Sequence, residues 1–267
     1  MRLRASIVAD RATKPSGGSN VIMQTLTLIL PCYNEEEALP PLFDRLREVK
    51  RSFGQTVALD FLFVDDGSKD RTAEVLESMP ADLMPARVVR HEVNRGLGGA
   101  IATGFREAAG EFVAIMDVDC TYDPMYLVEM LPLMQPGVDV VTGSEFHPKG
   151  KVENITWFRL FLSRNLSLLY RIAFWSNLYS FSCLLRIYRR EILENIMPTS
   201  RGFLSCTEVL ISAHRKGYRI VEFPLVLTER QHGESKMPIV RSIVDHCVFI
   251  AGSLLGRGRA TQQGGLS

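Results

Sequence analysis

The stretch Glu111-Phe-Val-Ala-Ile-Met-Asp-Val-Asp119 decides the fold of this chain. It contains an apolar run from Phe112 to Met116, which is typical of a buried strand. Two acids, Asp117 and Asp119, follow directly, and side chains two apart in a strand point to the same side. In an open α/β sheet, ligands bind where the strands end. The pair therefore suits a divalent cation that carries phosphate oxygens, although a strand end with two solvated acids has the same pattern.

Length and composition are those of a globular chain. It has 267 residues, of which 46% are hydrophobic and 23% are charged. A net charge of +1 excludes a general nucleic-acid binder, which would be strongly basic. Five scattered cysteines without a CxxC pair predict reduced thiols in a cytosolic setting. The sequence contains no uncharged apolar run of about 18 residues, so we expect no transmembrane span.

Composition divides the chain into four parts. Within residues 1–24, the stretch Ala12–Asn20 is polar and rich in Gly and Ser, which predicts a flexible tail. Residues 25–237 carry the strand and helix patterns of a folded domain. Residues 238–256 predict an amphipathic helix, and residues 257–267 predict a disordered polar tail.

Strand-like and helix-like segments alternate within the folded part. The other expected strands are Leu26–Leu30, Leu59–Val64, Arg87–Arg90, Val138–Thr142 and the short Leu225–Leu227. The expected helices are Leu39–Val49, Thr72–Met79, Ala100–Ala108, Pro124–Met134 and a helix within Lys151–Trp175. This alternation predicts an α/β fold, with a mixed, mainly parallel Rossmann-like sheet flanked by helices.

Acids follow the first two strands as well as the central one. Glu35 follows the first strand, and Asp65 and Asp66 follow the second. Carboxylates crowded at one edge repel one another unless a cation or hydrogen-bond donors offset their charge, and both are expected at a nucleotide site. At the first strand, we expect Asn34 to cap the next helix, with Glu35 and its two following acids in the first turn.

Several motifs then resemble a known family. The first four are Pro31-Cys-Tyr-Asn-Glu35, Val64-Asp-Asp-Gly-Ser-Lys-Asp-Arg-Thr72, Asn94-Arg-Gly-Leu-Gly-Gly-Ala100 and Met116-Asp-Val-Asp119. In this order they resemble the inverting nucleotide-sugar glycosyltransferases of family 2, which have the GT-A fold. Three later segments are similar to the dolichyl/polyprenyl-phosphate mannosyl- or glucosyltransferase branch: Arg186-Ile-Tyr-Arg-Arg-Glu191, Gly217-Tyr-Arg-Ile-Val-Glu-Phe-Pro224 and Arg230-Gln-His-Gly-Glu-Ser-Lys236.

The resemblance implies a role for each matched residue. The nucleotide pocket would be formed by Pro31, Tyr33, Glu35, Asp65, Asp66 and Gly98. Asp119 would be the main ligand of Mg²⁺ or Mn²⁺ on the donor diphosphate. Asp117 would hold the donor sugar or complete the metal site. Arg230 and Lys236 would bind phosphate during catalysis, on a loop that closes over the site, and His232 lies between them.

The acceptor-side signal lies in Lys151–Trp175. Arginines stand there among aromatic and apolar residues at helical spacing, which predicts either a membrane-surface helix or a core helix whose arginines reach solvent. By the resemblance, Arg159, Ser163 and Arg164 are the candidate ligands of an acceptor phosphate.

The chain departs from this branch at two places. Thr121 stands where the branch has a metal-binding Gln, and Cys183-Leu184-Leu185 replaces Ser-Gly-Phe. The acid that serves as general base in many inverting members is also missing near that point. A lipid monophosphate has its second pKa at about 6, so it is already an anion and needs positioning rather than a base.

The sequence thus favours an inverting, metal-dependent transfer of mannose or glucose from a GDP- or UDP-hexose to polyprenyl or dolichyl phosphate. We expect such a protein to lie peripherally on the cytoplasmic face of a membrane. A saccharide or small hydroxyl acceptor stays open because of the two departures. A non-catalytic nucleotide-sugar-binding subunit is the third possibility, and the intact Asp117/Asp119 pair argues against it.

Overall fold

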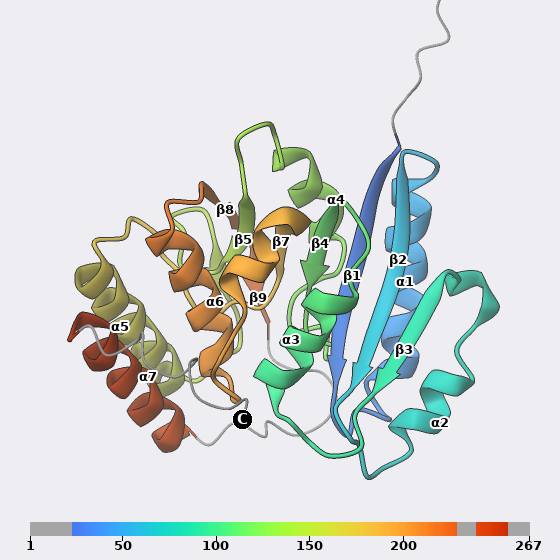
Figure 1. Ribbon diagram of the computed structural model, residues 1–267, viewed down its shortest axis with the longest axis horizontal. Coiled ribbons are helices and arrows are strands. Elements are labelled where there is room, and N and C mark those ends of the chain that lie inside the picture. Colours follow the sequence, from blue (N-terminus) through green and yellow to red (C-terminus); the bar gives the residue numbers. More distant parts are fainter. Residues whose placement is uncertain (1–22, 229–238, 256–267) are drawn as a thin grey trace, which may run out of the picture.

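The predicted mixed sheet is confirmed in the computed structural model, which describes residues 23–228 and 239–255 (Figure 1). Its strands are β1 (Gln24–Cys32), β2 (Val57–Asp65), β3 (Ala86–Arg90), β4 (Phe112–Ile115), β5 (Val140–Ser144), β7 (Arg186–Arg189) and β8 (Ile220–Pro224). In the described part they stand in the order β3-β2-β1-β4-β7-β5-β8. Strand β7 runs antiparallel to β4 and β5, whereas the other neighbours are parallel. A separate ribbon pairs β6 (Lys151–Val152) with β9 (Val226–Leu227).

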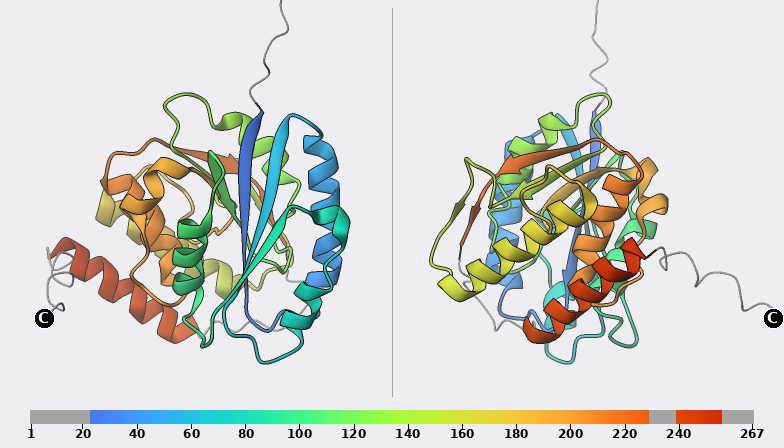
Figure 2. Two further views of the ribbon diagram at one scale, coloured as in Figure 1. Left: turned by 45° about the vertical axis from the view of Figure 1, so that its right-hand side comes forward. Right: turned by 90° about the vertical axis from the view of Figure 1, so that its left-hand side faces the viewer.

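Helices cover both faces of the sheet (Figure 2). One face carries α1 (Leu39–Phe53), α2 (Thr72–Glu77) and α4 (Tyr126–Met130), with the short 3-10 turns Ala81–Leu83 and Leu131–Leu133. The other carries α3 (Leu97–Glu107), α5 (Trp157–Phe174), α6 (Leu204–Arg215) and α7 (Ile239–Leu254), with the 3-10 segment Arg190–Ile196. Among the described residues, no helix is both long and apolar enough to cross a bilayer.

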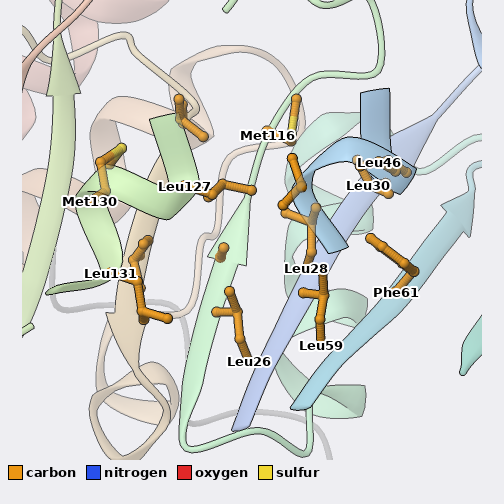
Figure 3. Close-up of a cluster of buried hydrophobic side chains, with 14 of the residues drawn as sticks. Leu26, Leu28, Leu30, Leu46, Leu59, Phe61, Met116, Leu127, Met130 and Leu131 are labelled. Atoms are coloured by element: carbon orange, nitrogen blue, oxygen red, sulfur yellow. The ribbon is translucent and has the colours of Figure 1, made fainter. Parts of the chain in front are cut away.

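The central strands have apolar side chains on both faces. Leu26, Leu28 and Leu30 of β1 belong to the cluster that includes Leu46 of α1 and Leu127 of α4 (Figure 3). The intervening β1 residue at position 29 packs on the opposite side, because successive strand side chains alternate between faces. A strand that is buried on both faces has a continuous run of apolar residues, and this run is the feature from which the strand was predicted.

The strand register brings the functional loops to one edge. Cys32 pairs with Asp65 at the ends of β1 and β2, and Ile29 pairs with Ile115 at the end of β4. The loops after β1, β2, β4 and β5 therefore leave the sheet at the same edge, which we call the carboxyl edge. Because β7 runs the other way, it is the loop entering β7 that reaches this edge.

The central strand is shorter than its apolar run. It ends at Ile115, although Met116 still donates a backbone hydrogen bond to Ile29 O at 3.2 Å. The following residues form a turn in which Cys120 has a φ of 53°. The period-two argument for the directions of Asp117 and Asp119 is therefore wrong, since neither residue lies in the strand.

The predicted helix cap at Asn34 is also wrong. Helix α1 begins at Leu39 after Ala38, and its first turn holds prolines rather than acids, because proline fits the first helical positions. Asn34 has a φ of 52°, and its Oδ1 accepts a hydrogen bond from Lys69 N at 2.8 Å. It therefore joins two loops of the carboxyl edge instead of capping a helix.

Other boundaries shift by a few residues. Helix α3 begins at Leu97 rather than Ala100, and the expected helix Pro124–Met134 consists of α4 and a 3-10 turn. Strand β8 lies in the Gly217–Pro224 motif, which had not been assigned as a strand. The expected helix of residues 238–256 is present as α7, and both expected tails fall almost wholly outside the described residues.

Candidate functional site

The loops after β1 and β2 are bound to each other. Glu35 N donates to Thr72 Oγ1 at 2.8 Å, and Asn34 N donates to Ser68 Oγ at 3.0 Å. In return, Glu36 Oε2 accepts from the backbone amide of residue 71 at 2.9 Å. These bonds satisfy backbone amides of the two loops and fix one loop relative to the other.

Asp65 is fully buried beneath these loops. Its Oδ1 accepts a hydrogen bond from Ser68 N at 2.9 Å. Its Oδ2 lies 3.2 Å from Arg90 Nε, in an ion pair without hydrogen-bond geometry. Arg90, at the end of β3, is thereby held at the carboxyl edge.

Asp66 bonds to the protein through both carboxylate oxygens. Its Oδ1 contacts His91 Nδ1 at 2.6 Å and accepts from Arg95 N at 2.8 Å. Its Oδ2 accepts from Gly96 N at 2.7 Å. Asp66 therefore shapes the turn before α3, and the base and ribose contacts that the resemblance implied for it stay a prediction.

A pocket of about 740 Å³ opens over the ends of β2 and β3. It is lined by Tyr33, Gly67, Ser68, Lys69, Arg90, His91, Glu92, Val93 and Asn94. This volume lies in the range of small-molecule sites and accommodates a nucleotide. Of the residues expected to bind the nucleotide, Tyr33 lines the pocket. Asp65 does not line it but forms an ion pair with Arg90, which does.

Gly98 has a packing role. Its amide donates to Arg201 O at 2.9 Å, and a Cβ on Gly98 would lie 1.8 Å from Ser200 O. The neighbouring Gly96, with a φ of 79°, approaches Arg201 in the same way. The Gly98 amide is thus used within the protein, and Gly98 is not among the residues that line the pocket described above, so its place among the nucleotide-binding residues stays a prediction. Glycines are needed here because α3 begins directly against another backbone segment.

The turn after β4 holds Asp117 and Asp119 half-exposed. Asp119 Oδ1 accepts from Thr121 N at 3.0 Å and from Thr121 Oγ1 at 2.7 Å. Thr121 thus supports Asp119 where the resembling branch carries a further metal ligand. Thr228 donates to Thr121 O through its amide at 3.3 Å and its hydroxyl at 3.2 Å, which brings the end of β9 beside this turn.

Asp119 also lines a second pocket of about 380 Å³ beside the start of α1. Arg45 of α1, Tyr126 of α4 and Thr228 contribute to its wall. Thr228 is the last residue described before 229–238. Arg230, His232 and Lys236 lie in that range, outside the described residues.

The donor set at this turn fits a hard divalent cation that is shared with substrate. Among the described residues, no group of three or more His, Cys, Asp or Glu side chains could hold a metal ion. Magnesium typically binds through one or two carboxylates, together with substrate phosphates and water. Asp117 and Asp119 supply such carboxylates, so a metal here would depend on the donor diphosphate for further ligands.

The two described members of the predicted acceptor set do not converge. Ser163 is half-buried, whereas Arg164 is exposed and its guanidinium carbon lies 5.6 Å from the centre of the Phe146 ring. Neighbouring helix positions are rotated by about 100°, so these two side chains leave α5 in different directions. Position 159 shares the face of Ser163, although the side chain of Arg159 lies outside the described part.

Two functional residues were missed by the sequence reasoning. Arg90 and His91 both line the large pocket, yet His232 was the single histidine expected near the site. A signal was present, because His91 directly follows an expected strand, as the recognised acids do.

A mainly parallel sheet with an acidic turn after its central strand, beside a nucleotide-sized pocket, defines a GT-A nucleotide-sugar transferase fold. The profile of Glycosyl transferase family 2 matches residues 27–197, and the chain belongs to this family of glycosyltransferases.

Three relatives have names that refer to lipid phosphates. The polyprenol monophosphomannose synthase of Mycolicibacterium smegmatis is 31% identical over 80% of this chain and 81% of its own length. The undecaprenyl-phosphate mannosyltransferase of Micrococcus luteus is 34% identical over 80% and 88%. The dolichol-phosphate mannosyltransferase of Pyrococcus furiosus is 30% identical over 79% of this chain, which spans only 59% of that protein.

Solved structures support the fold. Glucosyl-3-phosphoglycerate synthase from Mycobacterium tuberculosis, in complex with Mn²⁺, UDP and glucosyl-3-phosphoglycerate, has a TM-score of 0.65 and 19% identity, over 91% of this chain and 87% of that one. Its complex with Mn²⁺, UDP-glucose and phosphoglyceric acid has a TM-score of 0.65 and 20% identity, over 87% and 80%. At this identity, the likeness concerns the fold alone.

Proposed function

We propose that this enzyme transfers a hexose, with mannose favoured, from a nucleoside diphosphate hexose to polyprenyl phosphate with inversion. The observation that carries the proposal is the position of the Asp117–Asp119 turn. It follows β4, which stands in the sheet between β2 and β3, whose ends carry the large pocket, and β5, after which the chain leads to α5. The names of the relatives, which refer to mannosyl transfer onto lipid phosphates, support this acceptor class.

In this mechanism, the nucleotide lies in the large pocket. Lys69 and Arg90 line that pocket and offset anionic charge. Asp119, with Asp117, would hold Mg²⁺ or Mn²⁺, and the metal would neutralise charge on the departing diphosphate. Thr121 keeps the Asp119 carboxylate in place through its two hydrogen bonds. Arg230 and Lys236 are proposed as further phosphate ligands, because Thr228 brings the chain beside Thr121 just before them.

The transfer itself is one in-line displacement. An oxygen of the acceptor phosphate forms a bond to the anomeric carbon, while the bond from that carbon to the donor diphosphate breaks. The nucleoside diphosphate leaves with the electron pair, and the configuration inverts. No proton needs to be removed from a phosphate anion, so the residues mainly position it. Arg159 and Ser163, which share one face of α5, are the proposed ligands.

A membrane surface is the proposed location of this acceptor. Trp157 and Trp175 of the α5 region are 77% and 93% exposed, and other large apolar residues lie between them. Positions 157, 161, 168 and 172 fall within about 60° around the helix, and Trp175 directly follows its last residue in a left-handed conformation. We call these five residues the outward stripe. A surface helix normally turns polar residues outward, so this apolar stripe marks a surface that contacts lipid or protein.

Helix α7 extends the same surface. It lies beside α5 in the right-hand view of Figure 2, and His246 Nδ1 is 2.7 Å from Tyr170 OH between them. Val244 and Val248 of α7 are exposed as well. Two neighbouring helices with outward apolar residues suit peripheral binding to a membrane, on the cytoplasmic face where the nucleotide sugars are expected.

The test is a transfer assay with purified protein, Mg²⁺ or Mn²⁺, labelled GDP- and UDP-hexoses and a short-chain polyprenyl phosphate. Label that enters the organic phase and is released by mild acid is the expected result. The matched control replaces the lipid phosphate by the corresponding polyprenol. The proposal is wrong if the label stays in the aqueous phase with every donor while a saccharide acceptor becomes labelled. The acceptor would then be a hydroxyl group and not a lipid phosphate.

A further inference from the structure

Two arginines of α5, Arg164 and Arg171, lie beside the outward stripe, and the proposed transfer does not use them. At about 100° per residue, they lie about 20° and 40° to one side of the stripe. They are separated by about 10 Å along the helix axis. Arg164 is exposed and Arg171 is half-buried. The two arginines therefore form a basic row between the apolar stripe and the buried side of α5, which holds Ser167 and Tyr170.

Aromatic rings hold both arginines against the carboxyl edge. The guanidinium carbon of Arg164 lies 5.6 Å from the centre of the Phe146 ring, and that of Arg171 lies 5.0 Å from the centre of the Tyr179 ring. The ring centres of His147 and Tyr179 are 5.6 Å apart, which links the two contacts. Phe146 and His147 follow β5, and Tyr179 precedes β7. The basic row therefore faces the loops of the carboxyl edge.

The two guanidinium groups have no anionic partner within residues 23–228 and 239–255. Neither forms a hydrogen bond or an ion pair there. By contrast, Arg45, Arg47 and Arg87 each form ion pairs with acids. A ring offers no oxygen acceptor, so the five N–H donors of each guanidinium keep their capacity for oxygen ligands. The planar arrangement of these donors matches phosphate oxygens in pairs.

The neighbouring stripe indicates which kind of phosphate fits. Trp157 is 77% exposed and Ile172 is 66% exposed, and a small anion in solution would gain nothing from such side chains. At a bilayer, apolar side chains insert below the headgroups, while arginines beside them reach the headgroup phosphates. An apolar stripe with cations along one side is typical of a helix that lies on an anionic membrane.

We propose that Arg164 and Arg171 bind the phosphate groups of anionic phospholipids, so that the protein prefers anionic bilayers. This inference rests on the membrane location in the proposed function. It concerns a different phosphate from that of the acceptor, for which Arg159 and Ser163 are the proposed ligands. Because the basic row faces the loops at Phe146 and Tyr179, headgroup binding brings the carboxyl edge beside the membrane surface.

The experiment measures sedimentation of the full-length protein with vesicles of phosphatidylcholine alone or mixed with phosphatidylglycerol. The wild type should bind the mixed vesicles about 20-fold more tightly. An arginine near an anionic surface contributes about fivefold to binding. The double variant Arg164→Gln and Arg171→Gln should therefore bind the mixed vesicles about 20-fold more weakly than the wild type. Its affinity for phosphatidylcholine alone should stay within about threefold, because the stripe is unchanged.

Two further variants separate a defined site from general charge. Arg51→Gln with Arg106→Gln removes the same charge from exposed positions of α1 and α3, and should stay within about threefold of the wild type. Tyr179→Leu keeps every charge but removes one ring. It should weaken binding to the mixed vesicles about threefold, because Arg171 loses the contact that holds it.

Three results would overturn the role of the basic row. The first is an equal loss in the Arg51 and Arg106 pair, which would indicate a general charge effect. The second is a wild type that binds neither kind of vesicle, which would make the stripe a protein contact. The third is a 20-fold loss of affinity for a water-soluble prenyl phosphate without vesicles, which would make these arginines acceptor ligands.

The thermal midpoint of each variant reports whether it is folded. Selective binding to anionic vesicles without transfer from any nucleotide hexose would count against the proposed function and leave the phospholipid site valid.

Discussion

The donor half, β1 to β4 with their loops, differs from the acceptor half, β5 to α7, in how it completes its own surface. In the donor half, both oxygens of the buried Asp66 bond to protein groups, and Asp65 Oδ2, which has no hydrogen bond, forms an ion pair with Arg90. In the acceptor half, the outward stripe leaves apolar side chains uncovered, and Glu145 Oε2 has no partner in the described part. The donor half is thus organised before any ligand binds, whereas the acceptor half has groups that a partner would complete.

The largest expected effect is on catalysis in the donor half. Asp119→Ala should lower kcat about 100-fold or more, since metal stabilisation of a leaving group contributes several kcal/mol. Its thermal unfolding should change by only about 1 kcal/mol, because the hydrogen bonds from Thr121 are lost. Asp123→Ala is the control, as this exposed acid forms an ion pair with Arg45 at 2.6 Å. Unchanged turnover in Asp119→Ala would remove the metal assignment.

Asp66→Ala tests, by a stability measurement, whether the donor half depends on its internal hydrogen bonds. It should lower the free energy of unfolding by about 3 kcal/mol, because the Arg95 and Gly96 amides would lose a charged acceptor. Urea denaturation measures this loss. Asp70→Ala removes an acid that is less buried and should cost about 1 kcal/mol. Equal losses would show that Asp66 is no more structural than its neighbours.

Within the acceptor half, a fall in pH should destabilise the packing between α5 and α7. Burial lowers the pKa of His246 to about 4, so the folded protein keeps it neutral beside Tyr170. The unfolded chain binds this proton near pH 6.5, so the stability present above that pH is lost as the pH falls towards 4. The loss should be about 1 to 2 kcal/mol by pH 5. His246→Gln should reduce this pH dependence in thermal melts, and an identical profile would contradict the assignment.

The smallest expected change lies in the outward stripe. The double variant Leu168→Ser and Ile172→Ser should bind phosphatidylcholine–phosphatidylglycerol vesicles about tenfold more weakly in sedimentation assays. Its free energy of unfolding should stay within about 0.5 kcal/mol, because both side chains are already exposed. The matched control is Met84→Ser with Val88→Ser, two exposed apolar positions around β3. If both double variants bound vesicles equally weakly, the outward stripe would have no special role in membrane binding.

The sequence predicted the elements of the fold well, because apolar periodicity is a local signal. It predicted that Asp65 and the Asp117–Asp119 pair lie at one edge, since parallel strands end together. It did not predict β7 as a strand, and since a strand of four residues carries no sign of its direction, the antiparallel pairing was missed as well.

Individual site roles were harder to predict. The backbone amides that donate hydrogen bonds to the Asp66 carboxylate lie 29 and 30 positions away in the sequence. No local sequence pattern reveals such distant partners. Gly98 lies in a Gly-rich turn before a helix, and its small size allows close contact with Ser200, far along the chain. Glu145 follows an expected strand, but its burial and the missing partner of its Oε2 within the described part are visible only in the structure.

The antiparallel course of β7 has a consequence for how this enzyme can diverge. Donor loops leave the ends of β1, β2 and β4, whereas the loop of residues 176–185 enters β7 at the same edge. The two sets of loops therefore belong to separate stretches of chain. Substitutions or insertions before Arg186 can reshape the acceptor wall while the nucleotide loops keep their sequence. Under the proposed function, acceptor choice and donor choice would thus be modular traits, able to evolve independently on one unchanged sheet.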